Sequence, residues 1–161
     1  MPQPLPTGPR SGRSFATPCR RRRPTPIRST CHQSRRWALW LEEPPGHCVV
    51  ACDGARVLGS AKMGPNRPAA GAHIGTASFM VDSNARGAGI GRQLADFVIA
   101  WHRERGYLGI QFNAVVETNS SAVHLWQDRG FEIIGTVPGA FRSPTHGDVG
   151  LHIMFLDLRQ E

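Results

Sequence analysis

Three alternate glycines at positions 87, 89 and 91 constrain the fold of this chain more than any other feature. They follow a β-prone segment at 73–82, and they lead into apolar side chains with helical spacing: Ile90, Leu94, Phe97, Val98 and Trp101. Glycine allows a tight junction with backbone angles that other residues avoid. Gly106 predicts where the helix ends. The segment therefore predicts a strand, a glycine turn and an amphipathic helix in direct succession.

Further strand signals lie on both sides of this unit. Residues 47–53 and 56–62 are β-prone runs around Asp53-Gly54, which indicates a hairpin. Residues 108–117 alternate, with one face made of Leu108, Ile110, Phe112, Ala114 and Val116 and the other of Gln111, Asn113, Val115 and Glu117. A second helix is expected from Thr118 or Asn119 to Arg129, followed by strands at 131–137 and 149–158. This order predicts an α/β fold of the mixed α+β kind, with one βαβ crossover among antiparallel strands and with flanking helices.

The charge of the chain is divided between two segments. The net charge is +7 and the isoelectric point about 10.5, but residues 1–36 hold nine arginines, seven prolines and no acid. We expect 1–36 to be a disordered Arg/Pro-rich tail, because it cannot bury enough apolar surface to fold. The ordered domain is expected at 37–161, beginning with a short helix at 37–43. Nucleic-acid binding is not expected, because the run Arg20–Arg23 lacks interleaved aromatic residues.

Composition also excludes several classes of protein. No stretch approaches the roughly 20 apolar residues of a membrane span, and the first thirty residues lack the apolar core of a secretory signal. We therefore expect a cytoplasmic protein with no membrane association and with reduced cysteines. Cys48 and Cys52, with His47 beside them, lack a fourth ligand for zinc. No metal site is predicted.

The glycine turn has the chemistry of an anion site. Missing Cβ atoms let a ligand approach the backbone, and unpaired N–H groups at a helix start favour a phosphate. Arg86 and Arg92 would add charge-assisted bonds. The spacing does not match G-x-G-x-x-G, and no G-K-[ST] is present, so dinucleotide and P-loop sites are disfavoured. Taken alone, the turn is as consistent with a plain glycine-rich turn as with a phosphate site.

Two segments resemble the GNAT superfamily of N-acetyltransferases. Arg86-Gly-Ala-Gly-Ile-Gly91 is similar to the family's [RQ]-x-x-G-x-[GA] loop, and it follows the strand segment Ser78–Val81. Residues 116–131 are similar to its N-x-x-A-x-x-[LF]-[YW]-x-x-x-G-F helix. With every element in the expected order, the resemblance covers 47–158 and implies a mostly antiparallel GNAT-like sheet.

The resemblance implies acetyl-CoA as co-substrate. Strands 73–82 and 108–117 would diverge, with pantetheine between them and the pyrophosphate at 86–91. A backbone N–H near Val81 would polarise the acetyl carbonyl while the acceptor amine attacks directly. The implied cofactor-binding residues are Phe79, Met80, Val81, Arg86, Gly87, Ala88, Gly89, Ile90, Gly91, Arg92, Asn119 and Trp126.

Asn113, Asn119 and Glu117 are the candidate catalytic residues, because they surround the point where those strands would part. Each has a structural alternative: a strand hydrogen bond for Asn113, a helix cap for Asn119 and a solvated strand end for Glu117. Family members often carry a tyrosine as proton donor where this chain has Trp126, which does not titrate. Trp126 is then either a contact for pantetheine or a core anchor.

A small-molecule amine is the expected acceptor. The chain lacks a recognisable first strand and first helix of the family, which leaves the edge of strand 47–53 open and makes a homodimer possible. The alternative is a catalytically silent GNAT-like module that binds coenzyme A or a partner. A cationic acceptor would require several acids to converge on one cleft, the candidates being Glu42, Glu43, Asp53, Asp82, Glu117 and Asp148.

Overall fold

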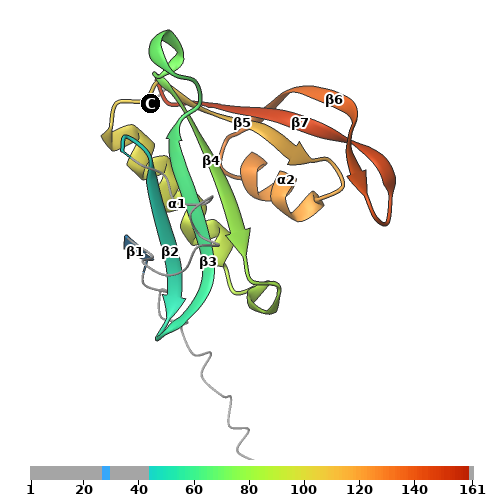
Figure 1. The fold of residues 1–161 in the computed structure, drawn as a ribbon, viewed down its shortest axis with the longest axis horizontal. Helices are drawn as coiled ribbons and strands as arrows, with labels where there is room; N and C mark the ends of the chain where they lie inside the picture. The colour runs from blue at the N-terminus through green and yellow to red at the C-terminus, as the bar shows by residue number, and fades with distance from the viewer. Residues whose placement is uncertain (1–26, 30–43, 160–161) are drawn as a thin grey trace, which may run out of the picture.

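The computed structural model describes residues 27–29 and 44–159. In chain order its elements are β1 (Ile27–Ser29), β2 (His47–Asp53), β3 (Arg56–Pro65), β4 (Ile74–Val81), α1 (Ile90–Glu104), β5 (Gly109–Val116), α2 (Ser120–Gln127), β6 (Glu132–Ser143) and β7 (Gly147–Asp157), with 3₁₀ turns at Ala69–Gly71 and Ser83–Ala85. The strands form one sheet in the order β1-β2-β3-β4-β5-β7-β6, in which only β4 and β5 are parallel (Figure 1). The predicted mixed fold with one βαβ crossover is confirmed. Among the described residues, no helix is long and apolar enough to cross a membrane.

The first strand corrects the expected N-terminal boundary. The composition of 1–36 predicts a disordered tail that includes residues 27–29, and the sequence shows no recognisable first strand. This is wrong for these three residues, because β1 pairs antiparallel with β2, with Ile27 opposite Ala51 and Ser29 opposite Val49. A strand this short depends on the edge that it joins rather than on its own propensity. The rest of the expected tail and the helix at 37–43 lie outside the described residues.

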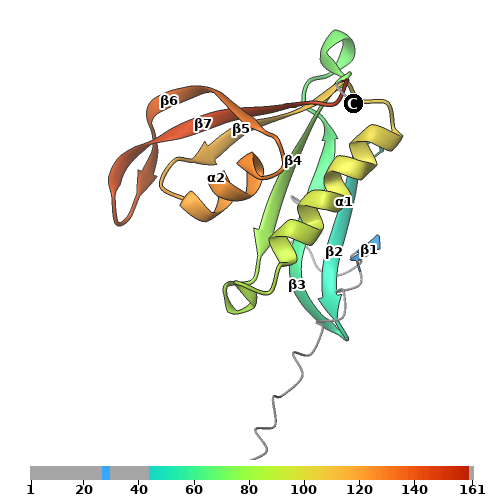
Figure 2. The same cartoon turned by 180° about the vertical axis from the view of Figure 1, so that it is seen from behind.

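Both helices pack on the same face of the sheet. One core cluster joins Leu94, Val98 and Trp101 of α1 to strands β2 and β3, and a second joins Ala95 and Trp126 to β5 and β7. Ala77 and Phe79 of β4 contact both clusters. Figure 2 shows α1 lying across β2, β3 and β4, with α2 beside β5. Among the described residues, no α-helix packs on the opposite face of the sheet.

The parallel strands pair at one end only. Ile74 is opposite Gly109 and Gly75 is opposite Ile110, and no further pairing joins β4 and β5 (Figure 1). The expected divergence of these strands is therefore confirmed. The imidazole of His102 lies fully buried against the last paired residue of β4, where a Cβ on Gly75 would overlap it. Its Nδ1 lies 2.8 Å from the Val98 carbonyl oxygen, and burial lowers the pKa of His102 below its ordinary value.

A bulge in β5 breaks the predicted alternation. Phe112 is opposite Met154 and Val115 opposite His152, so Asn113 and Ala114 together face Ile153. Both are exposed, whereas Val115 is 8% exposed and packs in the core. The predicted faces are therefore correct for Ile110 and Phe112 but wrong beyond them, because one extra residue shifts the side chains that follow to the other face.

Candidate functional site

A cleft of about 340 Å³ occupies the gap between β4 and β5. It is lined by residues 76–79 of β4, by 112–116 of β5, and by Asn119, Ala122 and Trp126. The Trp126 ring centroid lies 4.7 Å from that of Phe79 and 4.6 Å from that of Phe112. Trp126 is 6% exposed, so it is both a core anchor and part of the cleft wall. The helix side of the cleft is thus an aromatic surface.

The cleft side of β4 has a free backbone edge. At the two ends of its pairing with β3, Asn66 donates to the Ile74 carbonyl at 2.7 Å and Asp82 donates to the Leu58 carbonyl at 2.8 Å. Antiparallel ladder bonds engage alternate residues, so the even-numbered residues of β4 bond to β3. The N–H and C=O groups of Ala77, Phe79 and Val81 therefore point toward the cleft. An extended ligand can pair with such an edge as an added strand.

The glycine turn continues from this edge. Gly87 and Gly89 have φ of 74° and 79°, and a Cβ at either would meet no atom within 4 Å. Gly89 is the N-cap of α1 and has no side chain to satisfy the first amides. The Ala88 amide donates to the Ala85 carbonyl at 3.2 Å. It is the sole amide of residues 86–91 that donates to another described residue. The other amides are available to an anion.

The two predicted arginines differ in their surroundings. Arg86 is exposed beside the turn. Arg92 lies 3.4 Å from a carboxylate oxygen of Asp128, and both side chains are 59% exposed, so this ion pair is weak and open to exchange. Asp82, at the start of the turn, lies 2.7 Å from the Arg56 guanidinium, which holds the pKa of that carboxyl below its usual value.

The other predicted cofactor residues are divided between the surface and the core. Phe79 lines the cleft, and Met80 and Val81 are exposed at 45% and 39% where β4 approaches the turn. Ile90 is only 2% exposed, and its side chain packs in the core with Leu94 and Val98. Gly91 lies close to Leu125, since a Cβ there would be 3.4 Å from its Cδ2 atom.

The two candidate asparagines line the cleft, and each makes hydrogen bonds. Asn113 donates from Nδ2 to the Asn66 Oδ1 at 2.6 Å and accepts from Gln111 Nε2 at 2.8 Å. Asn119 caps α2, with its Oδ1 accepting from Ala122 N at 3.3 Å and from Ser121 Oγ at 3.0 Å. The Asn119 Nδ2 has no partner among the described residues and remains available to a ligand.

Glu117 is not brought into the cleft. Its Oε1 accepts from the Gly150 amide of β7 at 2.6 Å, and its own amide donates to the Gly150 carbonyl. The carboxylate therefore joins β5 to β7, on the far side of β5 from β4. The expectation that Glu117 shares the face of Asn113 is wrong, because the bulge intervenes between them.

Asn66 was missed by the sequence reasoning. It lies in the Pro/Gly-rich segment that follows β3, and nothing in the local composition distinguishes it from an ordinary loop asparagine. Only the fold places it against Asn113, 47 positions along the chain.

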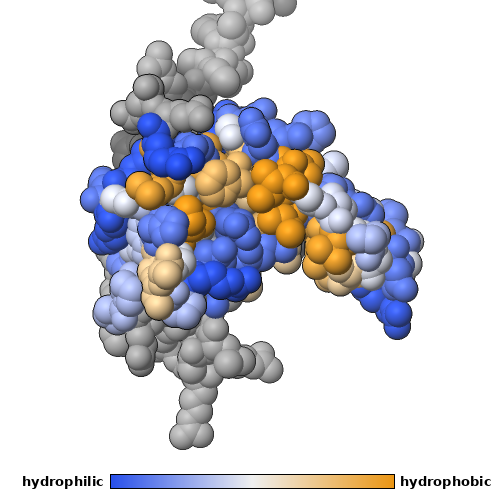
Figure 3. Space-filling view, turned by 90° about the horizontal axis from the view of Figure 1, so that it is seen from above, coloured by the Kyte–Doolittle hydropathy of each residue, from blue (hydrophilic) through white to orange (hydrophobic). Residues whose placement is uncertain are grey.

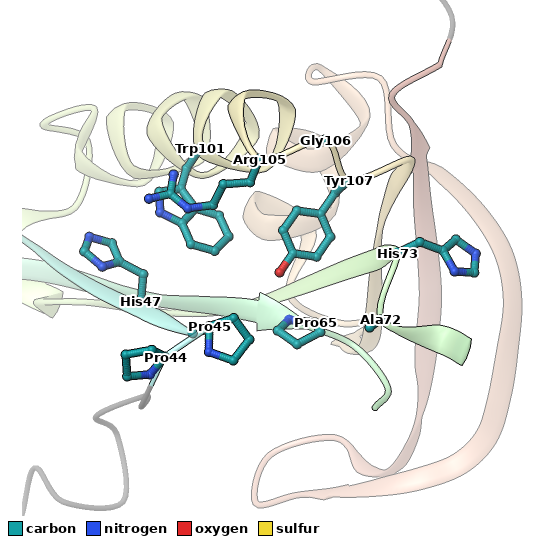
Figure 4. A pocket seen from close by; sticks show the side chains of 11 residues that line it. Pro44, Pro45, His47, Pro65, Ala72, His73, Trp101, Arg105, Gly106 and Tyr107 are labelled. Atoms are coloured by element: carbon teal, nitrogen blue, oxygen red, sulfur yellow. The ribbon is translucent and has the colours of Figure 1, made fainter. Parts of the chain in front are cut away.

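A larger hollow of about 630 Å³ lies at the end of α1 far from the glycine turn (Figure 4). His47, Trp101 and Tyr107 stack there, and the Arg105 guanidinium carbon lies 4.2 Å above the Trp101 ring. Burial lowers the pKa of His47 and raises the pKa of Tyr107, so both are neutral near pH 7. Tyr107 belongs to this hollow and not to the cleft between β4 and β5.

Residues 16–131 match the family model described as acetyltransferase (GNAT) family. The chain belongs to this family. The GNAT match begins at residue 16, inside the segment that composition assigns to the tail. It includes β4, the glycine turn, α1, β5 and α2, and therefore every element that lines the cleft.

Solved structures agree with the GNAT assignment. A GCN5-related N-acetyltransferase from Kribbella flavida is 49% identical, with a TM-score of 0.74, and the match covers 81% of this chain and 82% of that one. A ribosomal-protein-alanine N-acetyltransferase from Brucella melitensis is 32% identical, with a TM-score of 0.63, over 71% of this chain and 70% of that one.

A yeast protein also matches. N-acetyltransferase aca1 of Schizosaccharomyces pombe is 32% identical over 90 residues, which is 56% of this chain and 43% of that protein. The chain thus spans less than half the length of this relative. Across the residues that the structure describes, no group of three or more His, Cys, Asp or Glu side chains is arranged to hold a metal ion.

Proposed function

We propose that this GNAT protein transfers the acetyl group of acetyl-CoA to the amine of a small acceptor. The observation that carries the proposal is the open cleft between β4 and β5, whose free backbone edge leads directly into the glycine turn. Apart from that of Ala88, the amides of 86–91 have no partner among the described residues. An extended arm that ends in a diphosphate fits this succession, since the edge pairs with the arm and the turn binds the anion.

The chain's own residues divide the binding between them. Gly87 and Gly89 leave open space in which the diphosphate meets the amides of 86–91, with Arg86 and Arg92 beside it. Phe79 and Val81 offer backbone groups to the pantetheine arm, and Trp126 offers its ring. Acetyl-CoA supplies the activated acetyl group, so that a bond from the amine nitrogen to the acetyl carbon forms as the carbon–sulfur bond breaks, and the thiolate leaves.

Donors along the cleft would orient the acetyl group. The Val81 N–H points toward the cleft and is the proposed donor to the acetyl oxygen, since a preorganised amide favours the negative charge that develops there. Asn119 Nδ2 is a second donor at the other wall, while its Oδ1 stays on the helix cap. We assign positioning roles to Asn119 and Asn113 and none to Glu117, which is bonded to β7.

No proton acceptor lines the cleft among the described residues. Its lining contains no carboxylate, imidazole or phenol. We therefore propose that the acceptor amine loses its proton to water and that the thiolate takes one from water. The rate then depends on the fraction of acceptor that is already neutral.

The pH dependence of the reaction tests this proton route. With an α-amine acceptor of pKa about 8, the neutral fraction rises about 50-fold between pH 6 and pH 8, and we expect kcat/KM to rise in proportion. An alkyl amine of pKa near 10 should keep rising beyond pH 9. Thiol release at saturating acetyl-CoA gives both profiles. A common inflection near pH 6.5 for both amines would contradict the proposal and would indicate a titrating side chain.

An amine panel tests the function itself. Acetyl-CoA should raise the melting temperature of the full chain, and free thiol should appear when amino-acid amides, amino acids, alkyl amines and polyamines are offered in turn. A thermal shift without thiol release from any amine would favour the silent coenzyme A-binding module, an alternative supported by the non-titrating Trp126 at the position of the family's tyrosine. Absence of both signals would refute the proposal.

A further inference from the structure

The hollow at the end of α1 takes no part in the proposed acetyl transfer. Its volume of about 630 Å³ exceeds that of the cleft between β4 and β5, and the two have no lining residue in common. Its walls come from the start of β2, the end of β3, the loop before β4 and the end of α1. Concave surfaces of this size are typical of sites for small organic ligands. We call this surface the α1-end hollow.

Flat and rigid side chains form most of its walls. The rings of His47 and Tyr107 lie at 12° and 26° to the Trp101 ring, with centroids 6.0 and 5.8 Å from it. Figure 4 shows three prolines that line the same hollow across from Trp101 and Tyr107, namely Pro44, Pro45 and Pro65. Proline rings and stacked aromatic rings lose little conformational freedom when a ligand binds. The walls therefore suit a flat ligand.

Arg105 supplies the permanent charge of the hollow. Its guanidinium carbon lies 4.2 Å from the Trp101 ring centroid, and no carboxylate among the described residues forms an ion pair with it. The lining contains no Asp or Glu. Burial lowers the pKa of His47 and raises the pKa of Tyr107, so neither adds a charge near pH 7. The hollow therefore favours an anion over a cation.

The placement of Arg105 favours a carboxylate among anions. Stacking on Trp101 holds the planar guanidinium, and its fork of N–H groups matches the two oxygens of a carboxylate. Tyr107 offers one further donor, because its hydroxyl stays protonated and is bonded to no other described residue. In Figure 4 this hydroxyl is directed toward the side of Pro45 and Pro65. One guanidinium and one hydroxyl suit a monoanion better than a phosphate dianion.

The surface around the hollow is hydrophilic. Figure 3 views the molecule from the end at which α1 finishes, and blue, hydrophilic residues predominate there over β2, β3 and α1. The main apolar area in this view lies toward β6 and β7 instead. Docking surfaces for apolar partners are continuous apolar patches. These surroundings therefore suit a small charged ligand better than an apolar partner protein.

We infer that the α1-end hollow binds a small, flat aromatic carboxylate, with Arg105 pairing with the carboxylate and the Tyr107 hydroxyl donating to it. The aromatic part of the ligand packs against Tyr107 and the prolines. This site is separate from the cleft, so the inference does not depend on the proposed acetyl transfer.

Three related compounds test the inference on the full chain. We expect 2-naphthoate to bind with a dissociation constant below about 1 mM, measured by calorimetry. 2-Naphthamide has the same shape without the charge and should bind at least about tenfold more weakly, the effect of losing charge-assisted hydrogen bonds. Decalin-2-carboxylate keeps the charge but is not flat, and it should also bind more weakly. Absence of 2-naphthoate binding at about 1 mM, or equal binding by either of the other two compounds, would refute the inference.

Two arginine variants locate the carboxylate. Arg105→Met keeps an aliphatic cover over Trp101 but removes the guanidinium, so it should weaken 2-naphthoate binding at least about tenfold and leave 2-naphthamide unaffected. Arg103→Met is the matched control, because Arg103 is also exposed but does not line this hollow. Tyr107→Phe should weaken binding about threefold. Equal losses in Arg105→Met and Arg103→Met would overturn the inference, since they would indicate general attraction to a basic surface.

Acetyl-CoA distinguishes the α1-end hollow from the cleft. The cleft also has aromatic walls, but because the two share no residue, 2-naphthoate should bind equally well at saturating acetyl-CoA. Displacement of 2-naphthoate by acetyl-CoA would place the compound in the cleft and overturn the inference. If acetyl-CoA does not bind at all, the proposed function fails, and the comparison of Arg105→Met with Arg103→Met still decides the inference.

Discussion

Gly89→Glu should weaken acetyl-CoA binding more than 100-fold, which corresponds to about 2.8 kcal/mol. Gly89 caps α1 with φ of 79°, and the space beside it is open. A glutamate there would strain the backbone and would place its carboxylate where the diphosphate is proposed to meet the amides. The dissociation constant, measured by calorimetry on each purified variant, gives the result directly.

The opposite end of the same helix supplies the control. Gly106 has φ of 74°, and a Cβ there would also meet nothing within 4 Å. Gly106→Glu therefore introduces the same residue with similar backbone strain, far from the turn, and should leave the dissociation constant within about threefold. Equal loss of binding in both variants would mean that strain in α1, rather than an anion site at its start, explains the effect.

Glycine positions and apolar spacing predicted the turns and the helix, because these elements depend on residues close together in the sequence. The turn at Gly54, the helix end at Gly106 and the glycines at 87 and 89 all have positive φ, a conformation that glycine adopts without strain. The apolar spacing of α1 matches its buried face, which includes Ile90, Leu94 and Val98. The cleft was expected from the family resemblance, which implied that strands 73–82 and 108–117 diverge, and not from local signals; it is lined by β4, β5 and α2 with its N-cap.

Long-range contacts determined the parts that the sequence reasoning missed. β1 exists through its pairing with β2, and Glu117 is oriented by the Gly150 amide, 33 positions away. The bulge at Asn113 and Ala114 depends on how β7 pairs with β5, although the apolar run Ala114-Val115-Val116 is the one local hint of a break in alternation. Asn66 gains its role only when the fold places Asn113 beside it.

Gly75→Ala should destabilise the protein by about 2–3 kcal/mol, because overpacking a filled core forces side chains from their positions. Gly75 is the last residue of β4 paired with β5, and a Cβ there would overlap the His102 ring. His102 is fully buried and held through Nδ1 at Val98, so it has little freedom to move aside. Denaturant unfolding of the two proteins measures the difference.

Gly135→Ala in β6 is the matched control, since it also adds a methyl group to a strand glycine but meets nothing within 4 Å. It should change the free energy of unfolding by less than about 1 kcal/mol. A double-mutant cycle then assigns the cause, because the cost of Gly75→Ala should nearly disappear in a His102→Ala background. If the losses of unfolding free energy caused by Gly75→Ala and His102→Ala are additive, contact with the His102 ring is not the cause of the destabilisation by Gly75→Ala. If the coupling is found, the same contact that packs α1 against β4 also sets where β4 and β5 separate, so the core determines the position of the cleft.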